Sequence, residues 1–268
     1  MRAVKFVLTI LIAVWLSGAR AEVAVLVHGY LGSAASWEFS GVNAALHAHG
    51  WQPAGVIIPG PSGPLLPAPN AGAKRAVYAV ELPSTAPLMV QADILVAALN
   101  QVAARHGKEP INLIGHSAGG VVARMAMVRG GARGVARLIT IASPHLGTER
   151  ALEALDATQE RGPVGLVKNV FGGRDYRVVR NSWPVLLDLS PAVPGNILYW
   201  LNAQPHPKLR YFSIVRAAPF GLGDMLVPGF SQDMNNIPQL AGQNNTYVVP
   251  AGHSLTAADG TMLAQLMR

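Results

Sequence analysis

The chain has 268 residues, of which half are hydrophobic and 13% are charged. This composition excludes a disordered protein and provides enough apolar material for a large core. The sequence contains no cysteine, which excludes disulfides, thiolate metal sites and a cysteine nucleophile. The formal net charge is +7, but the basic residues are scattered and none of their runs is interleaved with aromatic residues. A nucleic-acid partner is therefore not expected.

The first 21 residues are typical of a secretory signal peptide. Two basic residues precede an apolar run over residues 6–15. Positions 19 and 21 hold the small residues that signal peptidase requires before its cleavage site. We expect cleavage after Ala21, export to the periplasm or the medium, and a mature domain over residues 22–268. An uncleaved N-terminal anchor is the alternative, although the run is shorter than the roughly 20 residues of a membrane span. Cleavage would reduce the net charge to +4, because the three basic residues of the leader are removed with it.

Short apolar runs alternate with helical patterns along the rest of the chain. A Pro/Gly-rich loop is expected at 59–72. Because the central strands are apolar throughout, the pattern predicts an α/β fold whose mostly parallel sheet is covered by helices on both faces. Strands are expected at 22–29, 51–60, 75–84, 111–115, 136–144, 209–217 and 246–252, and helices at 88–106, 119–130 and 255–268.

The interval 148–207 interrupts this alternation, because proline and glycine are scattered through it. Two interpretations are open. The interval is either a cap or lid inserted above the sheet, or a set of ordinary surface helices.

The segment "GHSAG" at residues 115–119 fits G-x-S-x-G, the pattern of a nucleophile elbow. In such an elbow the serine lies on a sharp, strained turn between a strand and a helix. Bulky neighbours would clash there, so small residues are required on both sides. An apolar strand precedes this segment and a helix follows it, which favours Ser117 as a nucleophile over a purely structural glycine-rich turn.

A serine hydroxyl becomes a good nucleophile only when a base takes its proton, and that base needs an acid that orients it. After a nucleophile elbow, the acid and then the histidine follow along the chain. His253, in the loop after the last strand, is the predicted base, and His145 is its main rival. Asp224, in a glycine-containing turn, is the predicted acid, and Asp188 and Asp233 are the alternatives.

Acyl transfer also requires hydrogen-bond donors for the oxyanion that develops on the carbonyl. The backbone N–H of Ala118, directly after the serine, is one predicted donor. The N–H of Tyr30, in the loop after the first mature strand, is the other, and Leu31 is the second choice for it. His28 and Gly29 shape this loop, and no acid–base role is expected for His28.

Taken together, these motifs resemble the α/β-hydrolase superfamily, and within it the bacterial lipase-like and esterase-like serine hydrolases. The matching segments are His28-Gly29, "GHSAGG", "SPHLGT", "GDMLVP" and "GHS". The resemblance extends from Glu22 to the last residue of the sequence, except in the 60–75 loop and the 148–207 interval. It implies a triad of Ser117, Asp224 and His253, with substrate contacts from Leu31, His116, His145 and Leu146.

The sequence departs from the calcium-binding bacterial lipases at two positions. Those enzymes carry an aspartate shortly after the catalytic histidine, where this chain has Ser254 and Leu255, and they often have glycine where Met225 stands. A calcium site of that type is therefore not expected. Neither a metal nor a cofactor is expected, since no histidine–carboxylate set has the spacing of a zinc site.

The expected reaction is the hydrolysis of carboxylic esters through an acyl-enzyme, and the expected partner is a small-molecule ester or a lipid. Transient contact with lipid surfaces is also expected, whereas the sequence does not predict the oligomeric state. A thioesterase, an amidase or an acyltransferase would use the same residues, and a non-catalytic binding module is a further alternative. Apolar residues of the proposed cap favour a lipid-like acyl group: Val164, Leu166, Val167, Val170, Phe171, Ile197, Leu198, Trp200 and Leu201.

Overall fold

A computed structural model of the chain describes residues 21–68, 74–158, 181–217 and 223–268. The predicted signal peptide, apart from Ala21, lies outside the described residues, as do residues 159–180 of the predicted cap. Within the described ranges, no helix combines the length and the apolar character needed to cross a bilayer.

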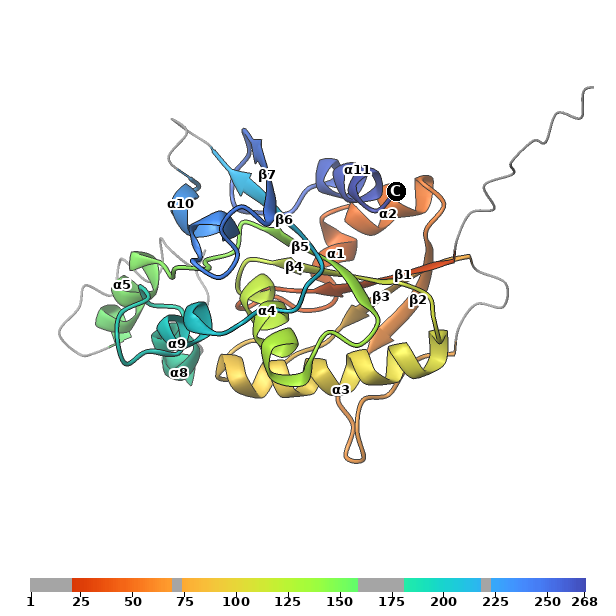
Figure 1. Cartoon of the computed structure of the whole chain (residues 1–268), viewed down its shortest axis with the longest axis horizontal. Coiled ribbons are helices and arrows are strands. Elements are labelled where there is room, and N and C mark those ends of the chain that lie inside the picture. The colour runs from red at the N-terminus through yellow and green to blue at the C-terminus, as the bar shows by residue number, and fades with distance from the viewer. Residues whose placement is uncertain (1–20, 69–73, 159–180, 218–222) are drawn as a thin grey trace, which may run out of the picture.

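Seven strands form one central sheet in the order β2-β3-β1-β4-β5-β6-β7 (Figure 1). Every neighbouring pair is parallel, so all seven strands end at the same edge of the sheet. This confirms the predicted α/β fold with a parallel sheet. The strands are β1 (Glu22–Val27), β2 (Gln52–Ile57), β3 (Arg75–Val80), β4 (Ile111–His116), β5 (Val135–Ile141), β6 (Arg210–Arg216) and β7 (Asn244–Val249).

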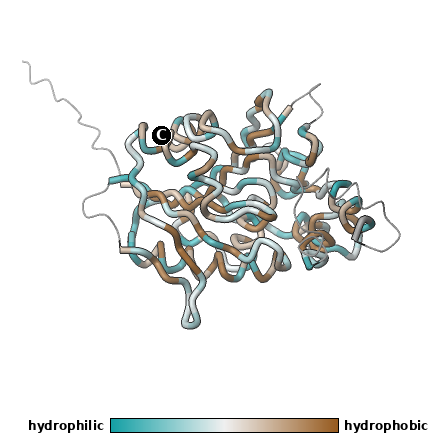
Figure 2. Tube along the Cα trace, turned by 180° about the vertical axis from the view of Figure 1, so that it is seen from behind, coloured by the Kyte–Doolittle hydropathy of each residue, from teal (hydrophilic) through white to brown (hydrophobic). Residues whose placement is uncertain are grey.

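Helices cover both faces of the sheet (Figure 1). One face packs on α3 (Leu88–His106) and α4 (Ala118–Gly130). The other packs on α2 (Val42–Ala48) and α11 (Ala257–Leu266), and the short helix α1 (Ser36–Phe39) lies beside α2. Figure 2 shows hydrophobic segments running through the middle of the molecule.

Strand β1 explains why the central strands are apolar throughout. Its alternate residues Val23, Val25 and Val27 belong to the core cluster beneath α3 and α4, whereas Ala24 and Leu26 belong to the cluster beneath α2 and α11. Both sides of the strand are therefore removed from water, which is typical of a parallel sheet with helices on both faces.

The described part of the 148–207 interval consists of helices beyond the carboxyl ends of the strands. They are α5 (Glu149–Thr158), α8 (Trp183–Asp188) and α9 (Ile197–Ala203), which gather at one end of the molecule in Figure 1. Leu186 and Leu198 are buried in the same cluster as α3 and α4, so these helices pack on the core. A separate cap or lid remains a prediction. Two short helices, α10 (Gly229–Gln232) and η1 (Met234–Asn236), precede β7.

A buried ion pair joins the end of β6 to α11. Arg216 donates from one Nη2 atom to both carboxylate oxygens of Asp259, at 2.7 and 2.8 Å, and the two side chains are only 1% and 3% exposed. Asp259 also accepts the N–H of Thr256 and closes a capping box at the start of α11. The pair therefore fixes where α11 begins relative to the sheet.

We predict that Asp259→Ala lowers the free energy of unfolding by about 3–5 kcal/mol, because the substitution leaves the Arg216 guanidinium buried without its counter-ion. Urea unfolding measures this. The exposed pair of Arg129 and Asp93, 3.0 Å apart, provides the matched control, since Asp93→Ala should cost less than about 1 kcal/mol. Equal losses in the two variants would contradict the prediction.

Candidate active site

Ser117 lies at the turn between β4 and α4 and has a positive φ, with φ +53° and ψ −129°. Such a conformation is strained for a residue with a side chain. The glycines two residues to either side leave room for it: a Cβ atom on Gly115 would overlap the backbone of Gly120, and one on Gly119 would overlap the carbonyl oxygen of His28. The small residues of the motif therefore allow strand and helix to approach each other closely and present the serine at the edge of the sheet.

His253 and Asp224 meet Ser117 from two other loops. The Nε2 atom of His253 is 2.9 Å from the Oγ atom of Ser117, and its Nδ1 atom is 2.8 Å from Oδ2 of Asp224. Because a carboxylate only accepts hydrogen bonds, Nδ1–H is the donor and Nε2 is left to accept the serine proton. The structure thus brings together all three residues predicted for the triad, in the geometry that general-base activation of a serine requires.

Asp224 is held as a carboxylate by its surroundings. Its Oδ1 atom accepts hydrogen bonds from the N–H groups of Leu226 and Val227, both at 2.7 Å. Burial by itself would raise the pKa of Asp224, but the hydrogen bond and charge of His253, together with these two N–H groups, outweigh it and lower that pKa. The group beneath the histidine is therefore negative at neutral pH.

Gln232 is a further residue of the site that the sequence did not reveal. It is 1% exposed, and its amide nitrogen donates to Oδ2 of Asp224 at 3.2 Å and to the carbonyl of Val227 at 2.8 Å. Its amide oxygen accepts the N–H of Arg216 at 2.7 Å. Gln232 therefore ties the acid loop to the end of β6. It belongs to no motif, and its only signal in the sequence is its position eight residues after Asp224.

The alternative acids and the alternative base lie elsewhere. Asp188 accepts the N–H of Leu88 at the start of α3, and Asp233 caps the helix η1. His145 is completely buried, and its Nε2 atom contacts the hydroxyl of Thr140 at 3.2 Å.

One of the predicted substrate contacts needs correction: His145 is 0% exposed, so its side chain does not reach the cavities beside Ser117. Leu146 is partly buried and packs against the main core cluster. Neither residue lines these cavities, and a substrate contact from Leu146 remains a prediction. Leu31 and His116 do line one of these cavities.

His116 also holds the backbone that carries the base. Its Nε2–H donates to the carbonyl of His253 at 2.9 Å, and the two rings are 5.2 Å apart. Burial, followed by the nearby charge of His253, lowers the pKa of His116 to about 3. The imidazole is therefore neutral under ordinary conditions and serves as a hydrogen-bond donor.

The predicted oxyanion loop lies directly over the serine. A Cβ atom on Gly29 would stand only 2.8 Å from that of Ser117, so the close approach requires glycine. His28 fixes this loop because its Nδ1 donates to the Gly29 carbonyl and its Nε2 accepts the N–H of Leu82, both at 3.1 Å. Burial lowers the pKa of His28, which keeps it neutral. Donation by the N–H groups of Tyr30 and Ala118 remains a prediction.

Two cavities meet at Ser117. One holds about 60 Å³ and is mainly apolar, with Pro144, Ala151, Leu186, Leu189 and Val227 among its walls. The other is an open groove of about 570 Å³, whose walls include the hydroxyl-bearing Ser36, Ser40 and Ser254 and the exposed Phe39. Ser117 and His253 line both cavities.

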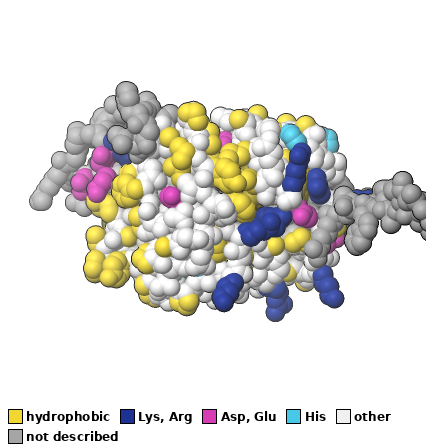
Figure 3. All heavy atoms as spheres, turned by 45° about the horizontal axis from the view of Figure 1, so that its top comes forward, with side chains coloured by type: hydrophobic (Ala, Val, Ile, Leu, Met, Phe, Trp, Pro, Cys, Tyr) yellow, Lys and Arg dark blue, Asp and Glu magenta, His cyan; other side chains and the backbone are white. Residues whose placement is uncertain are grey.

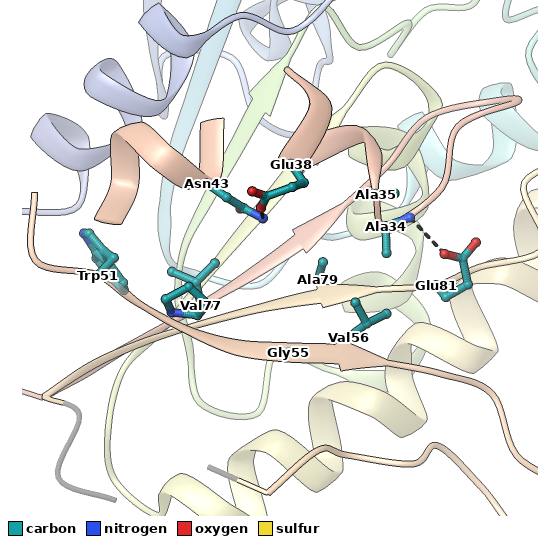
Figure 4. A pocket seen from close by; sticks show the side chains of 11 residues that line it. Ala34, Ala35, Glu38, Asn43, Trp51, Gly55, Val56, Val77, Ala79 and Glu81 are labelled. Carbon is teal, nitrogen blue, oxygen red and sulfur yellow. Dashed lines mark hydrogen bonds between the residues drawn. The ribbon is translucent and has the colours of Figure 1, made fainter. Parts of the chain in front are cut away.

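A third cavity, of about 420 Å³, lies between α1, α2, the edge strand β2 and its neighbour β3 (Figure 4). Trp51 and Val77 line it, and its carboxylates already have partners: Glu81 accepts the N–H of Ala34 at 2.9 Å, and Glu38 accepts from Asn43 at 3.0 Å. Neither Ser117 nor His253 reaches this cavity. In the described ranges, no cluster of three histidine or carboxylate side chains is arranged to hold a metal ion.

We predict that His116→Gln makes the stability of the protein less dependent on pH. An unfolded histidine binds a proton below about pH 6.5, whereas folded His116 does so only near pH 3. Folding stability therefore falls as the pH drops through this window, by up to about 1.4 kcal/mol per pH unit for one group. Glutamine keeps an N–H donor but has no proton to gain. The urea midpoint should therefore change less between pH 7 and pH 5 in the variant than in the wild type. Equal changes of the midpoint in the two proteins would contradict the prediction.

A family model described as a PGAP1-like alpha/beta domain matches residues 84–159 of this chain. No curated protein matches.

Several solved structures share the architecture at low sequence identity. The lipase BlEst2 of Bacillus licheniformis in its mature form has a TM-score of 0.61 and 16% identity, and the match covers 93% of this chain and 92% of that one. A lipase-esterase related protein of Clostridium acetobutylicum has a TM-score of 0.58 and 11% identity, covering 92% and 93%. The carboxylesterase CesB of Bacillus subtilis has a TM-score of 0.50 and 15% identity, covering 92% and 82%. The chain therefore has the α/β-hydrolase fold, as its resemblance to bacterial lipases and esterases implied.

Proposed function

We propose that this protein is an exported serine hydrolase that cleaves carboxylic esters. The observation that carries the proposal is the chain of contacts from the Ser117 hydroxyl through His253 to Asp224, at 2.9 and 2.8 Å. The family match and the lipase and carboxylesterase among the structural neighbours support it. Export is supported by the signal-like pattern of residues 1–21.

The contacts support a two-step reaction. His253 takes the proton of Ser117 as Oγ attacks the carbonyl carbon, and the oxyanion that forms is held by the N–H groups of Tyr30 and Ala118. His253 then gives the proton to the departing alcohol as the ester C–O bond breaks, which leaves the acyl group on Ser117. A water molecule, deprotonated by His253, attacks the carbonyl carbon of this acyl-enzyme. The bond between that carbon and Oγ of Ser117 then breaks, the acid leaves, and His253 returns the proton to Oγ. Asp224 keeps the imidazole in the required tautomer and stabilises it when it is charged.

The two cavities suit the two sides of an ester. The acyl group enters the apolar cavity, and its volume of about 60 Å³ favours a short chain. The alcohol part of the ester lies in the open groove, where the hydroxyls of three serine residues can form hydrogen bonds with a polar leaving group. The case for a lipid-like acyl chain depended largely on residues 164–171, which lie outside the described residues, so we propose a short-chain ester as the substrate class.

The proposal is tested by following the hydrolysis of p-nitrophenyl esters, from acetate to palmitate, by the chain that begins at Glu22. We expect turnover that falls once the acyl chain outgrows the cavity, and loss of at least about 10³-fold of the rate in Ser117→Ala. Equal rates in the wild type and the variant would refute the proposal. A flat rate from acetate to palmitate would contradict the short acyl cavity but leave the nucleophile in place.

We predict that Asp224→Asn reduces kcat by about 10⁴-fold, because an amide no longer selects the tautomer of His253 that accepts the serine proton. Asp233→Asn is the matched control. Asp233 lies nine residues further along the chain and caps η1, so that variant should keep the wild-type rate within about twofold. Steady-state kinetics on acetate measures both variants, and comparable losses would show that Asp224 has no special role.

A further inference from the structure

Exposed basic residues stand at the beginning of successive strands. Lys74 immediately precedes β3, Lys108 and Arg133 lie in the turns before β4 and β5, and Lys208 and Arg210 lie before and at the start of β6. All five side chains belong to exposed residues. Because the strands are parallel, these five residues share the end of the sheet opposite Ser117, and we call this surface the basic face.

The described acids on the basic face do not cancel its charge. Glu22 lies 3.6 Å from the buried Arg137, and Glu109 lies 2.8 Å from His106. Asp233, at the outer edge beside β7, accepts hydrogen bonds from Asn244 and Thr246. The five exposed cations and the buried Arg137 outnumber these three carboxylates, so the face keeps a net positive charge.

Among the described residues, the two ends of the sheet differ in charge. Glu81, Glu149 and Glu153 lie at or just beyond the carboxyl ends of strands, which is the end that carries Ser117. Of these three acids, Glu153 pairs with Arg150. Figure 3 shows the lysine and arginine side chains gathered toward one end of the visible surface. A surface with this polarity orients itself in the field of a negatively charged plane.

The basic face extends across most of the sheet. The strands β3, β1, β4, β5 and β6 are consecutive in the sheet, so cations at the starts of β3 and β6 are roughly 19 Å apart at about 4.8 Å per strand. Glu22, the first residue of β1, places the entry of the chain into the fold in the middle of this row. The apolar run of residues 6–15 ends only seven residues earlier, so membrane insertion of that run during export would bring the same face to the bilayer.

We propose that the basic face docks on an anionic lipid bilayer, with the Ser117 end of the molecule directed away from the membrane. The attraction is electrostatic and acts over about one Debye length, so it is strong at low salt and weak at high salt. The proposal is independent of the reaction that Ser117 performs.

The test is co-sedimentation of the chain beginning at Glu22 with vesicles of phosphatidylcholine containing roughly one third phosphatidylglycerol. We expect binding at about 50 mM NaCl that is lost at about 500 mM, and no binding to pure phosphatidylcholine vesicles. The triple variant Lys108→Gln, Arg133→Gln, Lys208→Gln should bind at least about tenfold more weakly.

A second triple variant separates the face from the net charge. Met89→Glu, Asn100→Asp and Ala203→Glu change exposed positions on α3 and α9. Together they lower the net charge by the same amount as the first variant but leave the basic face intact. This variant should bind like the wild type, and thermal unfolding verifies that both variants are folded. Equal weakening in both triple variants would overturn the proposal, as would binding to heparin or duplex DNA without binding to the anionic vesicles.

Discussion

The positive φ of Ser117 is the constraint on which the rest of the site depends. Its value of +53° holds the serine in a sharp turn between β4 and α4, and the neighbouring backbone can come this close only because Gly115 and Gly119 carry no side chain. Gly29 meets the same requirement from the oxyanion loop. The burial of β4 and α4 in the main core offsets the backbone strain at Ser117. The stability of the whole fold therefore holds a conformation that the local sequence alone would not adopt.

A second layer of contacts positions the histidine and the acid beside this partly buried serine. Asp224 and His253 are on different loops, and both loops are tied to the end of β6 through Arg216. Its backbone N–H is bonded to Gln232, which contacts Asp224, and its side chain holds Asp259 at the start of α11, shortly after His253. His116 adds a hydrogen bond to the backbone of His253 itself. Asp224 and His253 are thus positioned by hydrogen bonds that connect their loops to the sheet.

Much of the fold and the three central residues could be predicted, because they leave periodic or local signals. Strands buried on both faces appear as unbroken apolar runs, and the elbow requires glycines at fixed positions. The short helices α1 and α2 were not predicted, since four to seven residues hold too few turns for a helical period. His145 was misassigned because a motif shows its position along the chain but not that its side chain points into the core. Gln232 was missed because its role arises only from tertiary contacts.

The central claim is that His253 and Asp224 activate Ser117, and covalent labelling tests it most directly. The folded chain beginning at Glu22 would be treated with a fluorophosphonate probe, and the modified residue located by peptide mass spectrometry. The account predicts one label, on Ser117, which is greatly reduced in His253→Ala. A folded protein that stays unlabelled, or that is labelled equally with and without His253, would contradict it.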